Sequence, residues 1–220
     1  MLEKVPEAIG RALRDRRAGL DQLVYNQVDL RQGKAAITVT SGEFIDHAPL
    51  PAACTADGDG LSPSLNWTAL PTGAMEVLLL VEDADSPTPH PLVHAIAVMP
   101  ADQRVGVAAG ELSDDAAVRR SDGSAPDRVQ LGRNSFLQVG WLPPDPPPGH
   151  GPHRYAFQVY ALNAKVQFRG HPGRDAIVEA LHAHAIASGC LIGTYERRDG
   201  SITEAASGAE AVAPMVTPVA

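Results

Sequence analysis

The chain has 220 residues and a mass of 23.1 kDa, enough for one domain with a hydrophobic core of its own. Its formal net charge of −8 argues against nucleic acid as a partner, and 19 Pro, 20 Gly and 44% hydrophobic residues exclude both a helical bundle and a disordered chain. No apolar run reaches the roughly 20 residues of a membrane span, and the N-terminal region lacks a secretory signal. We therefore expect a cytoplasmic protein with no stable membrane insertion.

Residues 1–34 form a distinct N-terminal extension with a charge of +2, whereas the rest of the chain carries −10. Apolar residues recur at steps of three and four from Leu2 to Val24, with arginines between them. This spacing predicts an amphipathic helix over residues 1–24. Because the apolar stripe is thin and lacks Trp or Phe, it favours packing on the body of the protein or on a second subunit over a membrane. We therefore expect a homodimer.

From residue 35 onwards the apolar period changes to two, which predicts strands. The predicted strands cover residues 37–44, 77–82, 92–99, 155–162 and 191–197. Clusters of Gly, Pro, Asp and Ser separate them, a spacing typical of a β-sandwich. A helix is predicted over residues 175–189, closed by Gly189. Residues 35–200 thus form one domain, and residues 201–220, which lack any period, form a flexible tail.

The sequence predicts neither a metal site nor a cofactor. Cys54 and Cys190 lie far apart, so no disulfide framework or zinc knuckle is expected. His90 and His94 are four apart, but a proline and a strand between them prevent a shared helical face. The sequence also lacks a nucleophile elbow, a P-loop and a dinucleotide fingerprint.

Two stretches concentrate functional side chains, and the first covers residues 81–98. A strand delivers Asp83 and Asp85 into a proline-rich loop, and His94 follows near the start of the next strand. Carboxylates and an imidazole in this arrangement are suited to ligand binding or acid/base chemistry. An Asp before Ser-Pro also forms turns, so this stretch alone leaves both interpretations open.

The second stretch is a proline-dense loop that feeds a strand, residues 143–162. A strand beginning near His153 places His153 and Tyr155 on one face and Arg154 on the other. His and Tyr as the first inward residues indicate the wall of a small polar pocket, because a plain sandwich core would use Val or Ile. A structural role, in which His153 bonds a backbone carbonyl, is equally open.

Four motifs in order make the chain resemble the phosphatidylethanolamine-binding proteins, also called Raf-kinase-inhibitor-like proteins, in their bacterial form. The motifs are G-L-S-P-S-L-N-W at residues 60–67, D-A-D-S-P at 83–87 followed by His94, P-P-P-G-H-G-P-H-R-Y-A-F at 146–157, and L-I-G-T-Y-E-R at 191–197. They span most of residues 37–198. The resemblance implies a mainly β fold, a sandwich of two antiparallel sheets with peripheral helices.

The resemblance also implies a small cavity for phosphate-like anions. Taken over position by position, its residues are Asp83, Asp85, Pro87, His94, Gly140, Trp141, Pro147, His153 and Tyr155. Asp85 and Pro87 would shape a loop, with Gly140 and Pro147 near the mouth. Family members carry Tyr then Gly-Pro where this chain has Trp141 followed by Leu-Pro-Pro-Asp, so a permissive glycine and a hydroxyl donor are lost. Trp141 could instead form an apolar lid.

An anion in such a site would be repelled by Asp83 unless the carboxylate pairs with one imidazole and keeps that ring protonated. Affinity should then rise as the pH falls. The motifs place no Lys or Arg inward, so we expect modest affinity for bare phosphate and further contacts from the organic part of the ligand.

Three functions are compatible with these residues. The first is a binding protein whose cavity holds a small phosphorylated or carboxylated molecule. The second is an enzyme in which His94 and His153 exchange a proton with a substrate and Asp83 orients one ring, as in isomerisation, cyclisation or hydrolysis. The third is an inhibitory or regulatory protein that acts on a kinase or protease, a role that the family name suggests.

Overall fold

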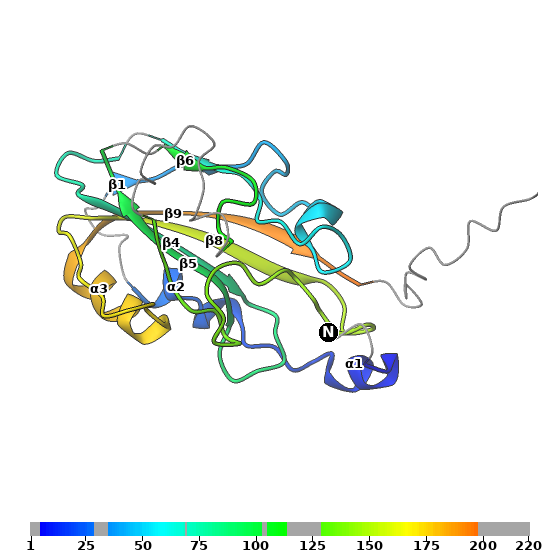
Figure 1. Cartoon of the computed structure of the whole chain (residues 1–220). Helices are drawn as coiled ribbons and strands as arrows, with labels where there is room; N and C mark the ends of the chain where they lie inside the picture. Colours follow the sequence, from blue (N-terminus) through cyan, green and yellow to red (C-terminus); the bar gives the residue numbers. More distant parts are fainter. Residues whose placement is uncertain (1–4, 29–34, 69, 103–104, 114–128, 198–220) are drawn as a thin grey trace, which may run out of the picture.

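The computed structural model describes the chain except residues 1–4, 29–34, 69, 103–104, 114–128 and 198–220 (Figure 1). The predicted tail, residues 201–220, lies outside the described residues. The division into an extension, one domain and a tail therefore stays a prediction.

The described strands form two sheets that pack on each other (Figure 1). The larger sheet has the order β1 (Ala35–Ala36), β9 (Ala185–Tyr195), β8 (His153–Leu162), β4 (Glu76–Asp83), β5 (Leu92–Pro100) and β7 (Gln130–Leu131). The smaller sheet has the order β2 (Val39–Thr40), β3 (Leu65–Trp67) and β6 (Gly106–Val107). Neighbouring strands are antiparallel except β1, which runs parallel to β9. The predicted mainly β sandwich of two antiparallel sheets is confirmed.

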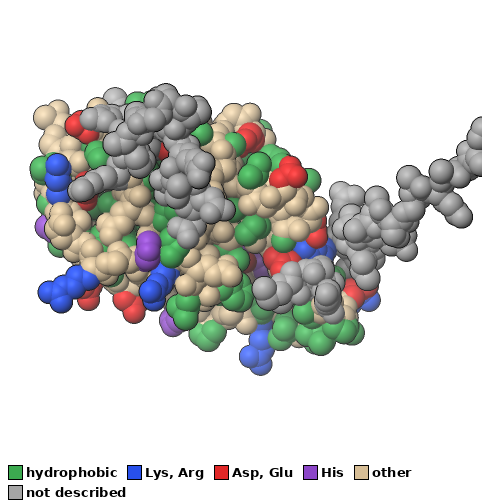
Figure 2. All heavy atoms as spheres, viewed as in Figure 1, with side chains coloured by type: hydrophobic (Ala, Val, Ile, Leu, Met, Phe, Trp, Pro, Cys, Tyr) green, Lys and Arg blue, Asp and Glu red, His purple; other side chains and the backbone are tan. Residues whose placement is uncertain are grey.

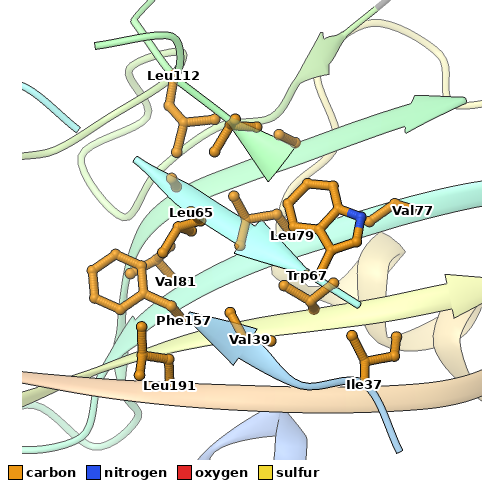
Figure 3. Close-up of a cluster of buried hydrophobic side chains, with 14 of the residues drawn as sticks. Ile37, Val39, Leu65, Trp67, Val77, Leu79, Val81, Leu112, Phe157 and Leu191 are labelled. Carbon is orange, nitrogen blue, oxygen red and sulfur yellow. The ribbon is translucent and has the colours of Figure 1, made fainter. Parts of the chain in front are cut away.

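The main hydrophobic core lies between the two sheets (Figure 3). Leu65 and Trp67 of the small sheet meet Leu79 and Phe157 of the large one. A second cluster on the opposite face of the large sheet includes Leu80 of β4 together with residues of α2 (Val24–Gln27) and α3 (Arg174–His184). Because β4 is buried on both faces, residues 77–81 are apolar without alternation.

The strands predicted over 77–82, 92–99 and 155–162 fall within β4, β5 and β8, whereas the bounds of three other predicted elements are wrong. Of the strand expected over 37–44 only the short β2 forms, with β1 just before it, and the strand expected over 191–197 begins earlier, at Ala185, and ends at Tyr195. The helix expected over 175–189 ends at His184, and β9 begins at once with side chains alternately buried and partly exposed. Gly189 lies inside this strand, where a Cβ would be 1.9 Å from the carbonyl oxygen of Ile37, so the close approach of the two backbones requires glycine.

The single helix predicted over residues 1–24 is also wrong. The structure has α1 (Glu7–Leu13), a 3-10 turn η2 (Leu20–Gln22) and α2. After α1 the chain turns at residues 14–15 and then has no regular structure up to η2, and the N–H groups of Ala18 and Gly19 donate to the carbonyl oxygens of Ser86 and Ala84 at 3.0 and 2.8 Å. Gly19, with a φ of 99°, turns the chain there. Tertiary hydrogen bonds therefore override the helical pattern in this segment.

The outer surface mixes apolar, acidic and basic side chains on the face shown in Figure 2.

A further 3-10 turn, η3 (Ala52–Cys54), lies in the loop before β3. Within the described ranges, no helix has the length and apolar character to cross a membrane, and no group of three or more His, Cys, Asp or Glu is placed to hold a metal.

Candidate functional site

The strand register brings Asp83, His153 and Tyr155 together at one end of the large sheet. Asp83 is the last residue of β4, and its partner across the β4–β8 ladder is Tyr155. Paired residues of neighbouring strands point to the same face, and His153 is on that face because it lies two positions before Tyr155. All three residues are buried. The predicted face of β8 is thus the face observed.

His94 reaches the same place through a β-bulge in β5. Val81 pairs with Ala95 and Glu82 pairs with Val93, so His94 is the extra residue opposite these two. Simple alternation from Ala95 would point His94 towards the other face of the sheet. The bulge instead lets the His94 ring pack edge-on against Tyr155, with ring centroids 5.1 Å apart.

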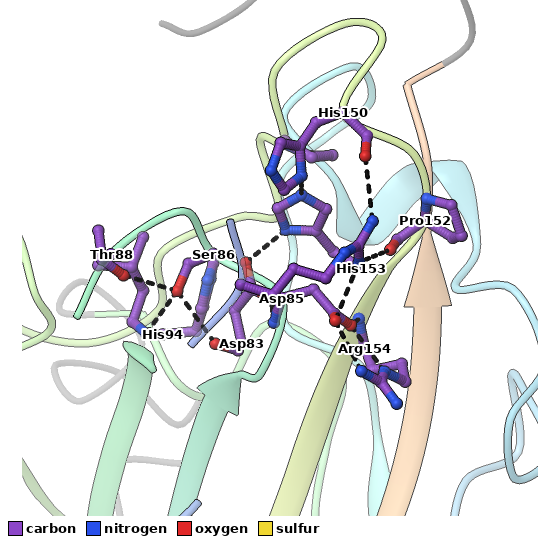
Figure 4. A network of polar contacts seen from close by, with 12 residues as sticks. Asp83, Asp85, Ser86, Thr88, His94, His150, Pro152, His153 and Arg154 are labelled. Carbon is purple, nitrogen blue, oxygen red and sulfur yellow. Dashed lines mark hydrogen bonds and ion pairs between the residues drawn. The ribbon is translucent and has the colours of Figure 1, made fainter. Parts of the chain in front are cut away.

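Asp83, His153 and His150 form a buried chain of hydrogen bonds, which we call the histidine relay (Figure 4). Asp83 Oδ2 lies 2.7 Å from His153 Nδ1, and His153 Nε2 lies 2.7 Å from His150 Nδ1. His150 Nε2 donates to the carbonyl oxygens of Leu13 at 2.9 Å and Arg16 at 3.2 Å. Asp83 Oδ1 accepts the backbone N–H of Asp85 at 2.8 Å. Both ring nitrogens of His153 are therefore already bonded within the protein.

A second group of buried polar atoms differs from the relay in having no hydrogen-bond partners. These atoms lie on the rings of His94, Tyr155 and Trp141, which we call the ring cluster. His94 Nε2, the Tyr155 hydroxyl and Trp141 Nε1 have no hydrogen-bond partner among the described residues. The His94 and Trp141 ring centroids are 6.2 Å apart, and Trp141 stacks on Phe157. Leaving a buried polar group unsatisfied costs about 1–3 kcal/mol, so three such groups on neighbouring rings are an unusual feature of this end of the sheet.

The electrostatics of the ring cluster favour neutral side chains at pH 7. Burial lowers the pKa of His94, although the nearby Asp83 carboxylate and the Leu142 carbonyl oppose this. Burial, and then the charge of Asp83, raises the pKa of Tyr155 well above its ordinary value. Because His94 Nδ1 donates to the Leu142 carbonyl at 2.7 Å, Nε2 of the neutral ring is an acceptor. The cluster thus offers one acceptor, one indole N–H donor and one hydroxyl.

Asp85 points away from the ring cluster and binds two arginines. Its carboxylate accepts Arg154 Nε and Nη2, both at 2.7 Å, and forms an ion pair with Arg17 at 2.9 Å. Burial alone would raise the pKa of Asp85, but the hydrogen bonds from Arg154 and Arg17 outweigh it and lower the pKa to about 2. Asp85 therefore holds β8 and the N-terminal segment against the β4–β5 loop.

Replacing Asp85 by Asn is expected to destabilise the protein by up to about 2 kcal/mol at pH 7. The stabilisation from a lowered carboxyl pKa is complete above the ordinary value of 3.8 and disappears as the pH falls towards 2. Urea unfolding at pH 7, 4 and 2.5 measures the difference, with the exposed Asp59→Asn as control. A difference between wild type and Asp85→Asn that stays constant over this range would refute the assignment.

The other predicted site residues lie on the loops around these groups. Pro87 follows Asp85 in the β4–β5 loop, and Pro147 precedes His150, whose N–H donates to the Pro147 carbonyl at 3.2 Å. Gly140 has a φ of 87°, which favours glycine directly before Trp141. The part of Pro87, Gly140 and Pro147 in a ligand site stays a prediction.

Sequence reasoning missed His150, Arg17 and Arg197. Arg197 is 2% exposed and binds Asp57, Asp145 and the Pro146 carbonyl, with Nη1 2.7 Å from Asp145 Oδ1. It thereby ties the end of β9 to the loop that carries Trp141 and His150. His150 was visible in the motif P-P-P-G-H-G-P-H, whereas nothing local in the sequence links Arg17 to a loop more than 130 residues away.

Comparisons with known proteins agree with this architecture. The family model described as phosphatidylethanolamine-binding protein matches residues 40–196. A UPF0098 protein of Aquifex aeolicus is 31% identical over 185 residues, covering 81% of this chain and 99% of its own, and one of Pyrococcus abyssi is 29% identical, covering 76% and 89%. The crystal structure of Escherichia coli YbcL, described as a new member of the mammalian PEBP family, is 27% identical with a TM-score of 0.66, covering 74% and 99%.

The fold and the site together define a class of protein. It is a β-sandwich that buries Asp, His and Tyr side chains at the end of its large sheet. The chain belongs to the phosphatidylethanolamine-binding protein family. The resemblance noted from the four motifs is confirmed.

Proposed function

We propose that the chain is a binding protein whose ring cluster receives the acidic group of a small phosphorylated or carboxylated molecule. The observation that carries this proposal is the set of three buried, unpartnered polar atoms on His94, Tyr155 and Trp141. A ligand that satisfies them recovers the cost of burying each group without a hydrogen bond.

The three atoms select the protonation state of that acidic group. The Tyr155 hydroxyl and the Trp141 N–H can donate to ligand oxygens, whereas the neutral His94 ring presents a lone pair. A fully ionised acidic group would be repelled by this lone pair, because its oxygens carry negative charge and no proton to donate. Binding therefore takes up one proton, either on the ligand or on His94, and the apparent affinity falls about tenfold for each pH unit above the pKa of the ligand.

Acid/base catalysis is the second candidate, and one observation bears on it. Both ring nitrogens of His153 are occupied by Asp83 and His150, so His153 is not free to exchange a proton directly with a substrate. His94, with its free Nε2, is the group that would act as the base in an enzyme built on this site.

A thermal-shift titration tests the proposed ligand class. Phosphoethanolamine, inorganic phosphate and citrate are each titrated into wild type and His94→Phe at pH 6 and pH 8. At about 100 times the dissociation constant, a ligand stabilises the folded state by about 2.7 kcal/mol. We expect a shift that is larger at pH 6 in wild type and is lost in His94→Phe.

The matched control is His171→Phe, because His171 also donates to a backbone carbonyl, that of Leu131 at 2.9 Å, away from the ring cluster. This variant should keep the full ligand shift. An equal shift in wild type and His94→Phe would contradict the proposal.

The compartment and the assembly of the protein are separate questions, each with its own test. We keep the cytoplasm as the proposed compartment, which cell fractionation tests. The homodimer was expected because the N-terminal helix needed cover, but α1 packs on the loop before β8 of its own chain, where Gly10 is buried. Light scattering of the full chain decides whether a dimer nevertheless forms. An inhibitory action on a kinase or protease stays a prediction.

A further inference from the structure

The N-terminal residues 6–17, which we call the strap, lie directly on the loop that carries His150. A Cβ at Gly10 would be 1.9 Å from the carbonyl oxygen of Pro148, and one at Gly149 would be 2.9 Å from Glu7 Cγ. Arg17 closes the contact by donating to the carbonyl oxygens of Pro152 at 2.8 Å and His150 at 3.0 Å. The strap and the loop therefore fit backbone against backbone.

The strap is held by these polar contacts and not by the hydrophobic core. Of the seven residues of α1, only Gly10 is buried, and Ile9 is 48% exposed. The chain enters the core only after the Gly19 turn, where Leu23 and Val24 are 2% and 0% exposed. Undocking of residues 6–17 would break these hydrogen bonds and the ion pair between Arg17 and Asp85, but it would expose little apolar surface.

The hydrogen bonds of the relay fix the number of protons that it holds while the strap is docked. Among the described residues His150 Nε2 faces the carbonyl oxygens of Leu13 and Arg16, which only accept, so this nitrogen carries a proton. The contact between the two rings needs one proton, and the contact between His153 and Asp83 needs another. Two neutral imidazoles and a carboxylate supply only two protons. The docked relay therefore holds a third, which makes the buried trio neutral overall.

We propose that docking of the strap sets the proton content of the relay, so that the strap is docked only while Asp83, His153 and His150 share three protons. With two protons, one hydrogen bond of the relay has no donor. The His150 ring then has to place its proton either towards the strap carbonyls or towards His153, so these two contacts compete. With four protons, Nδ1 of His150 and Nε2 of His153 are both donors and face each other at 2.7 Å. Docking therefore has a maximum in pH and weakens on both sides.

The surroundings of His150 agree with the expected loss of docking on the acidic side of this pH maximum. Burial and the neighbouring His153 lower the pKa of His150, so a fourth proton is disfavoured while the strap is docked, and docking is lost as the pH falls. Among the described residues, the charged or titratable groups around it are His153 of β8 with Asp83 of β4 behind it, Arg17 of the strap with Asp85 behind it, Arg14 of the strap beside Gly151, and the Glu7–Arg11 pair of α1 beside Gly149.

The test uses the full chain without any ligand, so it stands or falls independently of the proposed function. Gly10→Ala adds one methyl group that cannot fit against Pro148, while Gly173→Ala adds the same group where nothing lies within 4 Å. Nuclear magnetic resonance follows the ring N–H protons of the relay against pH, and hydrogen exchange follows the backbone N–H groups of Arg16 and Ala18.

In wild type and Gly173→Ala we expect hydrogen-bonded ring protons on His150 and His153 and protected strap amides. In Gly10→Ala the strap amides should lose at least about tenfold in protection, and the pH midpoint for loss of the third relay proton should fall by at least about one unit. Arg17→Gln should act in the same direction without changing the packing of α1.

Two results would overturn the proposal. One is a strap that is released in Gly10→Ala while the ring protons and their titration stay as in wild type. The other is unchanged amide protection in both Gly10→Ala and Arg17→Gln.

Discussion

Replacing Asp83 by Asn should lower the free energy of unfolding by about 3 kcal/mol or more at pH 7, although the two side chains have nearly the same size. The Asp83 and His153 side chains are 5% and 1% exposed, and in the relay proposed above they share a third proton with His150. An amide cannot balance that proton. The relay must then either keep a buried uncompensated charge or lose a hydrogen bond, and removal of one partner from a buried pair is among the costly substitutions.

Urea unfolding of wild type, Asp83→Asn and the exposed Asp59→Asn measures this effect at one pH. We expect the Asp59→Asn variant to stay within about 0.5 kcal/mol of wild type. A loss of the same small size in Asp83→Asn would mean that Asp83 is not part of a buried charge pair.

Replacing Tyr155 by Phe should have two effects of opposite sign. In the absence of ligand, the variant should be as stable as wild type or more stable, because the buried hydroxyl has no partner and its removal relieves a cost. The affinity for phosphoethanolamine should fall about 10- to 100-fold, because a hydrogen bond to a charged group contributes about 1.5–3 kcal/mol.

Tyr160→Phe is the matched control on the same strand. The Tyr160 hydroxyl is buried and donates to Gln158 Oε1 at 2.8 Å on the opposite face of the sheet. This variant should lose about 1 kcal/mol of stability and keep the affinity of wild type. Calorimetric titration and urea unfolding of both variants separate the two effects. If Tyr155→Phe instead loses stability and keeps its affinity, the hydroxyl has a structural role.

The sequence predicted those parts of the fold that depend on local pattern. The strands β4, β5 and β8 are buried runs bounded by turn residues, and the alternation along β8 placed His153 and Tyr155 on one face. Asp83 was predicted as a site residue from the resemblance, because its place after a strand left a turn-forming role equally open. The ladder that pairs it with Tyr155 was not predicted and appears only in the structure.

Other features depend on contacts between distant residues and have no local signal. The bulge that turns His94 towards Tyr155 reverses the face that alternation predicts. The start of β9 was hidden in an Ala-rich stretch that also suits a helix, and the pairing of this stretch with β8 and β1 is not visible in the local sequence. The break after α1 arises from Arg17 and from backbone bonds to residues 84–86. Propensity is a weak guide where tertiary contacts of this kind compete with it.

The central claim is that His94, Tyr155 and Trp141 hold the acidic group of a ligand. The most direct measurement is a nitrogen NMR titration of the histidine rings with phosphoethanolamine at pH 6, because it observes His94 Nε2 itself. We expect His94 Nε2 to change from a free acceptor to a hydrogen-bonded nitrogen as the ligand binds, together with shifts of the Trp141 indole N–H, while His171 stays unchanged. If the His94 and Trp141 signals are unaffected by saturating ligand, the ring cluster is not the binding site.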